Sequence, residues 1–149
     1  MMLNASIDWP GLHSPAMMSE SLYEVFYASC IAPREPPAAV ALILARARAA
    51  NAAHGITGLL VFDGVRFLQH IEGPPSTLGR LWERIATDPR HTDVRVIYRG
   101  VLAQRRHRRF EAGFAEPPET EGGDSLRGLQ GEAALQRFLA LRGQFDIQG

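Results

Sequence analysis

The stretch ITGLLVFDGVRFLQHIEG, residues 56–73, decides the fold of this chain. It contains two apolar runs, residues 58–62 and 66–72, and each has the length of a β-strand. Asp63 and Gly64 lie between the runs, and this dipeptide supplies the positive φ of a tight hairpin turn. The stretch therefore predicts two neighbouring antiparallel strands.

The sequence before this hairpin predicts a strand and then a helix. Residues 22–29, LYEVFYAS, are rich in aromatic and β-branched residues, and a Pro-rich stretch at 32–37 ends them. Over residues 38–51 the apolar side chains recur at i, i+3, i+4 and i+7, which is helical spacing. These are Val40, Ile43, Leu44 and Ala47. Asn51 continues this face, so the helix is expected to point an amide inward.

The sequence after the hairpin predicts a second helix and two more strands. Ser76 or Thr77 can cap the helix and Pro89 stops it. Its apolar stripe consists of Leu78, Leu81, Trp82 and Ile85. A fourth strand is expected at 94–102 and a short fifth one at 108–114.

A C-terminal helix is expected at residues 132–141, after a linker at 117–124 that is rich in Pro, Gly and acidic residues. Leu135, Phe138 and Leu139 share one face of this helix. That face must be buried, either on the chain's own sheet or against another copy.

The order strand, helix, strand, strand, helix, strand is the ferredoxin-like plan, an α+β fold, here with a fifth strand and a C-terminal helix added. We expect three parts: a partly disordered extension at 1–20, the domain proper at 21–116, and the linker and helix at 117–149. Many unrelated functions use this plan, so function must be inferred from particular residues.

Composition restricts the class of protein. The 149 residues are 46% hydrophobic, enough for the core of one domain. Sixteen basic residues, all Arg, balance sixteen acidic ones, so no overall field favours nucleic acid or an anionic membrane. Cys30 is the only cysteine, which excludes an internal disulfide and fits a reducing, cytoplasmic location. No segment approaches the roughly twenty apolar residues of a membrane span.

No familiar catalytic or metal-binding motif is present in the sequence. A phosphate-binding loop, a dinucleotide glycine fingerprint, zinc-ligand spacing and a nucleophile elbow are all absent. We therefore expect no metal site and no common enzyme class.

Two polar side chains are predicted to lie among apolar neighbours. Tyr27 shares a strand face with Tyr23 and Val25, and Gln69 lies between Phe67 and Ile71 on its own strand. Burying an unpaired amide costs about 1 to 3 kcal/mol, so Gln69 should have partners. Rotating an amide exchanges its donor and acceptor ends, which suits a switch. A core tyrosine and an amide on an exposed edge strand are the structural alternatives.

Two basic segments have more than one interpretation. Arg90 and His91 could hold a phosphate or a ribityl chain, or could belong to a solvated loop. Residues 105–109, RRHRR, could bind anions or nucleic acid. Strand-edge charges that discourage aggregation are the favoured reading of RRHRR.

Residues 22 to about 114 resemble the BLUF domains, which are flavin-binding sensors of blue light. The chain is similar to the short, single-domain members of this family. The resemblance is carried by LYEVFYAS at 22–29, NAAHGITGLLVFDGVRFLQHIEG at 51–73 and DPRHTDV at 88–94. In this family an oxidised flavin, usually FAD, lies between the two helices with its ring against the sheet. The resemblance implies FAD here, with FMN or riboflavin possible.

The resemblance also implies roles for individual residues. Tyr27 matches the tyrosine that donates an electron and a proton to the photoexcited flavin, and Gln69 the glutamine that links it to the flavin ring. Asn51 matches an asparagine that hydrogen-bonds the ring, and Ile43 an apolar side chain packed against it. The loop with Arg90 and His91 matches the one that holds the polar flavin tail.

Three positions depart from the family pattern. Ala50 stands where many members have a second polar residue, which removes one possible flavin contact. Phe110 and Ala112 stand where the family has a Trp and a Met that relay the signal. These departures predict normal photochemistry with altered signal transmission.

These observations together predict a non-enzymatic photoreceptor that signals to a separate partner or through a homo-oligomer. Light would drive electron transfer from Tyr27 and a rearrangement of the Gln69 amide. Two alternatives remain at this stage: a small acylphosphatase-like enzyme using Asn51 and an Arg, and a nucleic-acid adaptor acting through Arg105–Arg109.

Overall fold

A computed structural model describes residues 21–32, 38–88, 91–115 and 130–148. The expected N-terminal extension and the linker at 117–124 lie outside these ranges. Within them, no helix is both long enough and apolar enough to cross a membrane.

The predicted ferredoxin-like sheet is confirmed, and the described part of the chain contributes six strands to it. They are β1 (Leu22–Ile31), β2 (Thr57–Phe62), β3 (Arg66–Gly73), β4 (His91–Leu102), β5 (Phe110–Phe114) and β6 (Asp146–Gln148). Their order across the sheet is β4-β1-β3-β2-β5-β6. The first four strands pair antiparallel in the ferredoxin-like order, and β5 adds to the β2 edge in parallel.

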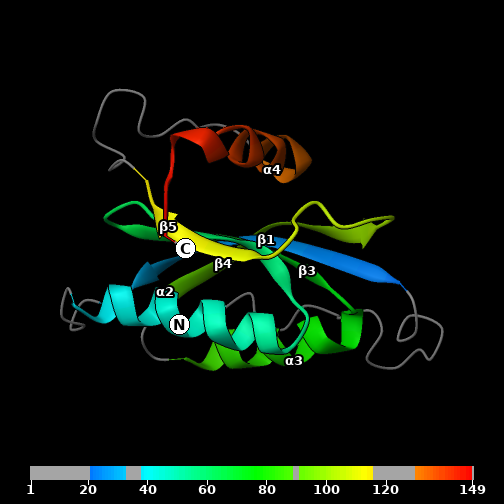
Figure 1. The fold of residues 1–149 in the computed structure, drawn as a ribbon, viewed down its shortest axis with the longest axis horizontal. Helices are drawn as coiled ribbons and strands as arrows, with labels where there is room; N and C mark the ends of the chain where they lie inside the picture. Colours follow the sequence, from blue (N-terminus) through cyan, green and yellow to red (C-terminus); the bar gives the residue numbers. More distant parts are fainter. Residues whose placement is uncertain (1–20, 33–37, 89–90, 116–129, 149) are drawn as a thin grey trace.

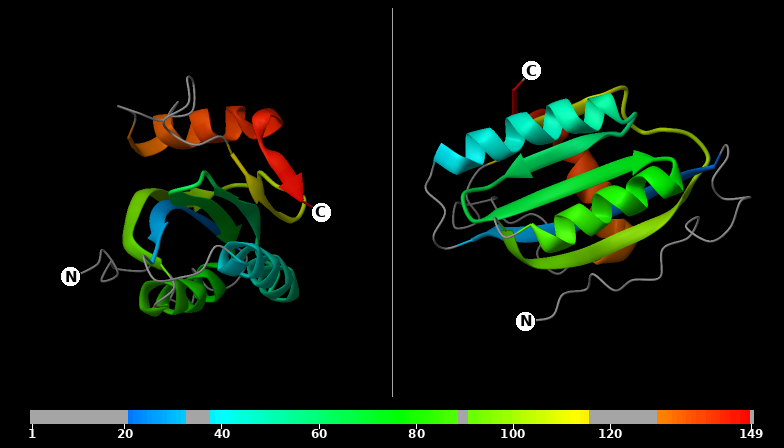
Figure 2. Two further views of the ribbon diagram at one scale, coloured as in Figure 1. Left: turned by 90° about the vertical axis from the view of Figure 1, so that its left-hand side faces the viewer. Right: turned by 90° about the horizontal axis from the view of Figure 1, so that it is seen from below.

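Helices cover both faces of this sheet, so the molecule has three layers (Figure 1). Helices α2 (Ala38–Ala53) and α3 (Pro75–Thr87) lie on one face, and α4 (Gly131–Ala140) lies on the other. The two views of Figure 2 show the same separation of the helices. After α4, a short 3₁₀ turn (Arg142–Gln144) leads into β6, which pairs with β5.

Alternation along the strands builds one core on each face, because successive side chains of a strand point to opposite sides. Val25, Tyr27 and Ile71 face α2 and α3, whereas Phe26 and Leu68 face α4. The helical stripe expected from Leu78 to Ile85 is buried in the first core.

The hairpin between β2 and β3 forms as expected, but its two turn residues act differently. Gly64 has φ of 98° and supplies the left-handed conformation of the tight turn. Asp63 contributes its carboxylate, whose Oδ1 accepts hydrogen bonds from the backbone N–H groups of Val65 at 2.9 Å and Arg66 at 2.7 Å.

Several element boundaries differ from the sequence-based expectation. Helix α3 begins at Pro75 after an N-cap at Pro74, and no side chain caps it, so the capping role expected of Ser76 or Thr77 is wrong. Proline is favoured at the first helical position, where its missing N–H costs nothing. Strand β4 begins at His91 rather than at residue 94, and the short strand β6 was not predicted.

Helix α4 buries its apolar face on the sheet of its own chain. Leu135 and Phe138 are both completely buried, and the ring of Phe138 stacks on that of Phe26 with centroids 4.7 Å apart. Leu139 is partly buried in the same core. The sequence left two partners open for this face, the chain's own sheet or another copy. In the structure the face packs on the sheet.

Candidate functional site

The strand register places four residues in a row across the face that α2 and α3 cover. Tyr27 of β1 is opposite Gln69 of β3, Gln69 is opposite Leu60 of β2, and Leu60 is opposite Ala112 of β5. Period-two alternation then directs all four side chains to the same side. The hairpin and the β1–β3 pairing therefore bring Tyr27 and Gln69 together.

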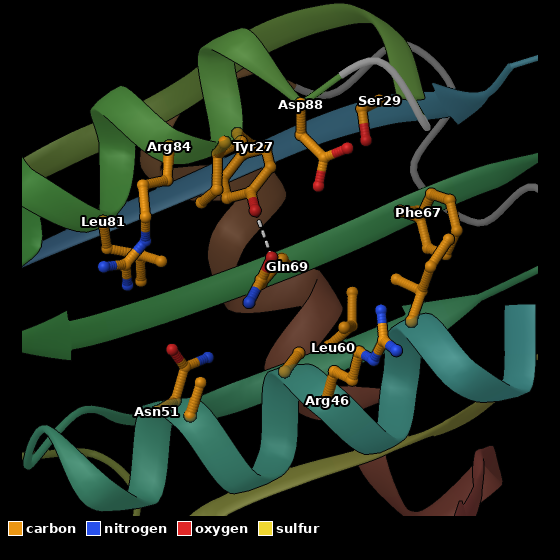
Figure 3. Close-up of a pocket in the computed structure, with 14 residues that line it drawn as sticks. Tyr27, Ser29, Arg46, Asn51, Leu60, Phe67, Gln69, Leu81, Arg84 and Asp88 are labelled. Carbon is orange, nitrogen blue, oxygen red and sulfur yellow. Dashed lines mark hydrogen bonds between the residues drawn. The ribbon is translucent and has the colours of Figure 1, made fainter.

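A cavity of about 240 Å³ opens between this row and the two helices (Figure 3). Its lining is mainly apolar, with a few polar groups, as is usual for small-molecule sites. The lining residues from the sheet are Tyr27, Ser29, Leu60, Phe67 and Gln69. Those from the helices and their ends are Ile43, Arg46, Ala47, Ala50, Asn51, Leu81, Arg84, Ile85 and Asp88.

The Tyr27 hydroxyl donates a hydrogen bond to Oε1 of Gln69 (Figure 3). Tyr27 is 1% exposed and Gln69 is 5% exposed, so the pair is shielded from water. Trp82 meets the Tyr27 ring edge-on, with centroids 5.2 Å apart, and holds it in place. Burial, followed by the negative charge of Asp88, raises the pKa of Tyr27 far above its ordinary value. The hydroxyl therefore keeps its proton at neutral pH.

Two amides direct unused hydrogen-bonding groups into the cavity. Among the described residues, none hydrogen-bonds the side chain of Asn51, which is 2% exposed. The Nε2 group of Gln69 also has no partner within the described part of the chain. Buried polar groups in native proteins are nearly always paired. The two amides thus fit a flat ligand that carries both donors and acceptors on its edge.

Two arginines of the pocket were missed by the sequence analysis. Arg46 lies on α2 and Arg84 on α3, and neither forms an ion pair with another described residue. A signal was available, because Arg46 follows Ile43 by three residues and Arg84 follows Leu81 by three, which is the same helical face. Their positive charges suit a ligand with phosphate groups.

The other predicted site residues lie at or beside the cavity, at the start of β4, or outside the described residues. Arg90 lies outside the described residues, and His91 is the first residue of β4 rather than part of a loop. Ala50 lines the cavity. Phe110 and Ala112 are buried on β5 beside the cavity but do not line it.

The basic stretch Arg105–Arg109 lies in the segment between β4 and β5, and its four arginines are exposed. Arg106 pairs with Glu24 at 2.9 Å, Arg109 pairs with Glu111 at 3.3 Å, and Arg105 donates to Thr57 at 2.8 Å. The favoured interpretation as strand-edge charges stays a prediction, and these contacts add partners for three of the arginines.

A ferredoxin-like sheet with a two-helix pocket, a buried tyrosine–glutamine pair and open amides defines a small ligand-binding domain. The family of sensors of blue light using FAD, BLUF, matches residues 22–113. This chain belongs to the BLUF family, so the resemblance seen in the sequence is confirmed.

Individual relatives agree with this assignment. Photoactivated adenylate cyclase subunit beta of Euglena gracilis is 40% identical over 63 residues, 42% of this chain and 7% of that protein. The blue light- and temperature-regulated antirepressor BluF of Escherichia coli K12 is 32% identical over 73 residues, 49% of this chain and 18% of that protein. The dark-state structure of the BLUF protein BlrB matches with a TM-score of 0.67 at 29% identity, covering 83% of this chain and 98% of that one.

Proposed function

We propose that this chain is a blue-light photoreceptor that binds FAD in the pocket between α2 and α3 and turns over no substrate. The observation that carries the proposal is the buried Tyr27–Gln69 hydrogen bond beside an amide whose Nε2 is open to the cavity. Bound flavin would supply absorption of blue light and, once excited, strong oxidising power.

Different residues of the pocket would bind different parts of the flavin. Asn51 and Gln69 would hydrogen-bond the polar edge of the ring, and Ile43 would pack against the ring. Arg46 and Arg84, together with Arg90 and His91 as the family resemblance implies, would hold the phosphates of the flavin tail. These cations support a phosphate-bearing flavin, FAD or FMN, over riboflavin.

Tyr27 and Gln69 would perform the light response. Tyr27 is the proposed electron and proton donor, because its hydroxyl is protonated, buried and bonded to the amide. Gln69 is the proposed switch, because its Oε1 accepts from Tyr27 while its Nε2 faces the cavity. Rotating this amide would exchange donor and acceptor at the pocket without moving the backbone.

The output of this switch is also a proposal. Leu60 separates Gln69 from Ala112 in the row across the sheet, so a change at the amide can reach β5 only through neighbouring side chains. We expect weak coupling, since Ala112 is short where the family has a Met. A separate partner or a homo-oligomer would receive the signal.

The location of the protein is a further proposal. The lone thiol of Cys30 favours a reducing, cytoplasmic location.

Tyr27→Phe is expected to remove the light-induced red shift of the flavin bands while flavin remains bound. The ring still packs on Trp82, but no hydroxyl is left to donate. Absorption spectra before and after blue light measure the effect. Tyr98→Phe is the matched control, since Tyr98 lies on β4 outside the cavity, and it should keep the shift. A normal shift in Tyr27→Phe would remove Tyr27 from the mechanism.

A further inference from the structure

A second polar cluster lies on the opposite face of the sheet from the flavin pocket. It combines His70 and Glu72 of β3 with His107, which comes from the segment between β4 and β5. His70 and Glu72 are fully buried and His107 is half-buried. In Figure 1 the yellow-green segment that carries His107 passes over the α4 side of the sheet.

The ligand atoms of these three side chains converge. The Nδ1 atom of His70 is 2.8 Å from Nε2 of His107, and the two nitrogens and a carboxylate oxygen of Glu72 all lie within 4.8 Å of one another. Zinc binds nitrogen and oxygen ligands at about 2.0–2.2 Å, so the ligand atoms of a tetrahedral site stand roughly 3.3 Å apart. Accommodating an ion requires the two nitrogens to separate by about half an ångström. The Glu72 oxygen, which lies within 4.8 Å of them, would also have to close to the same spacing.

The hydrogen bonds around the cluster define the protons of its rings: Nδ1 of His70 accepts from Nε2 of His107, and His107 must move this proton to its own Nδ1 before Nε2 can bind a metal ion. Nε2 of His70 is 2.7 Å from Oε1 of Glu24, and an ionised carboxylate only accepts, so His70 carries a proton at Nε2 and presents a lone pair at Nδ1 when neutral. A carboxylate behind a ligating histidine is the usual support of a metal site.

Glu72 is held in place but retains acceptor capacity. Its Oε2 accepts from Thr57 Oγ1 at 2.7 Å and from the backbone N–H of His107 at 2.9 Å. Its Oε1 accepts from the backbone N–H of Arg106 at 2.8 Å and has no second partner among the described residues. One of the four lone-pair positions of the carboxylate therefore remains open.

The charge balance of the cluster also favours a cation. Glu24 and Glu72 lie directly opposite each other on β1 and β3, and both are buried. Like charges in this position repel. Arg106 pairs with Glu24, but no guanidinium of the described part of the chain forms a salt bridge with Glu72. Within the described residues, an arginine side chain thus forms a salt bridge with one of the two buried carboxylates but not with the other.

We propose that His70, Glu72 and His107 bind a divalent transition metal ion, preferentially Zn²⁺, with Glu24 orienting His70. Two imidazole nitrogens and one carboxylate oxygen suit zinc and leave a fourth position for water. The ion would link the segment before β5 to β3 through His70, the residue next to Gln69. Sequence spacing could not reveal this site, because His70 and His107 are 37 residues apart and meet only through the sheet.

Zinc titration tests the proposal. The tag-free protein is first stripped of metal with a chelator, and its zinc binding is then measured by competition with a chromophoric zinc indicator. We expect one Zn²⁺ per chain in the wild type and at least a tenfold loss of affinity in His107→Ala. His54→Ala is the matched control, since His54 is exposed in the turn directly after α2, and it should bind as the wild type does.

X-ray absorption of the zinc-loaded wild type provides a test that needs no variant. Two imidazole ligands with nitrogen or oxygen distances of about 2.0–2.2 Å are expected. Absence of saturable zinc binding, equal binding by His107→Ala and the wild type, or a zinc shell without imidazole would each overturn the proposal.

Discussion

Gln69→Leu is expected to abolish the light-induced red shift completely while flavin stays bound. Leucine is similar in size to glutamine, but it is apolar and has neither a donor nor an acceptor to exchange. The lost hydrogen bond to the ligand should weaken flavin binding by about 0.5 to 1.5 kcal/mol, roughly two- to tenfold. The Tyr27 hydroxyl loses its buried acceptor, so the variant should also be less stable by about 1 to 3 kcal/mol.

Absorption spectra in the dark and after blue light measure the first effect, and flavin titration measures the second. Thr57→Val is the matched control, because it removes a side-chain hydrogen bond to Glu72 on the same sheet but outside the flavin cavity. It should retain the full shift. A red shift of ordinary size in Gln69→Leu would show that the amide is not the switch.

Leu135→Ala is expected to destabilise the protein by about 2 to 5 kcal/mol, as large-to-small substitutions in cores do. Leu135 is completely buried between α4 and the sheet, so its removal leaves a cavity in the second core. Typical domains are stable by about 5 to 15 kcal/mol, so this loss is a large share of the total. Urea unfolding measures it.

Leu42→Ala provides the control with the same chemistry. Leu42 is on α2, 47% exposed and outside the cavity, so its truncation should cost less than about 0.5 kcal/mol. Equal effects of the two substitutions would mean that α4 does not pack on the sheet in solution. If α4 instead packed on another copy, the unfolding midpoint of the wild type would rise with protein concentration.

Much of this fold could be predicted because its elements carry local signals. The Asp63–Gly64 turn fixed the central hairpin, and the helical repeat that ends at Asn51 identified α2. Strand β6 gave no such signal, because three residues after a 3₁₀ turn are too short for a periodicity. Its pairing depends on β5, where Gly113 leaves room for the backbone of Asp146.

The candidate site was predictable where alternation and resemblance agreed. Tyr27 and Gln69 follow from strand periodicity, and their pairing follows from the antiparallel order of β1 and β3. Arg46 and Arg84 were missed because arginines on helices are usually solvated, and only the packing of both helices over one cavity brings them to it. His70 and His107 were missed because their encounter depends on the path of a loop.

The measurement that tests the central claim most directly is the absorption spectrum of the purified wild-type protein before and after blue light. We predict that the protein is yellow, that its flavin bands move slightly to the red on illumination, and that they return in the dark. A protein that takes up no flavin, or whose flavin spectrum is unchanged or irreversibly bleached by blue light, would contradict the account.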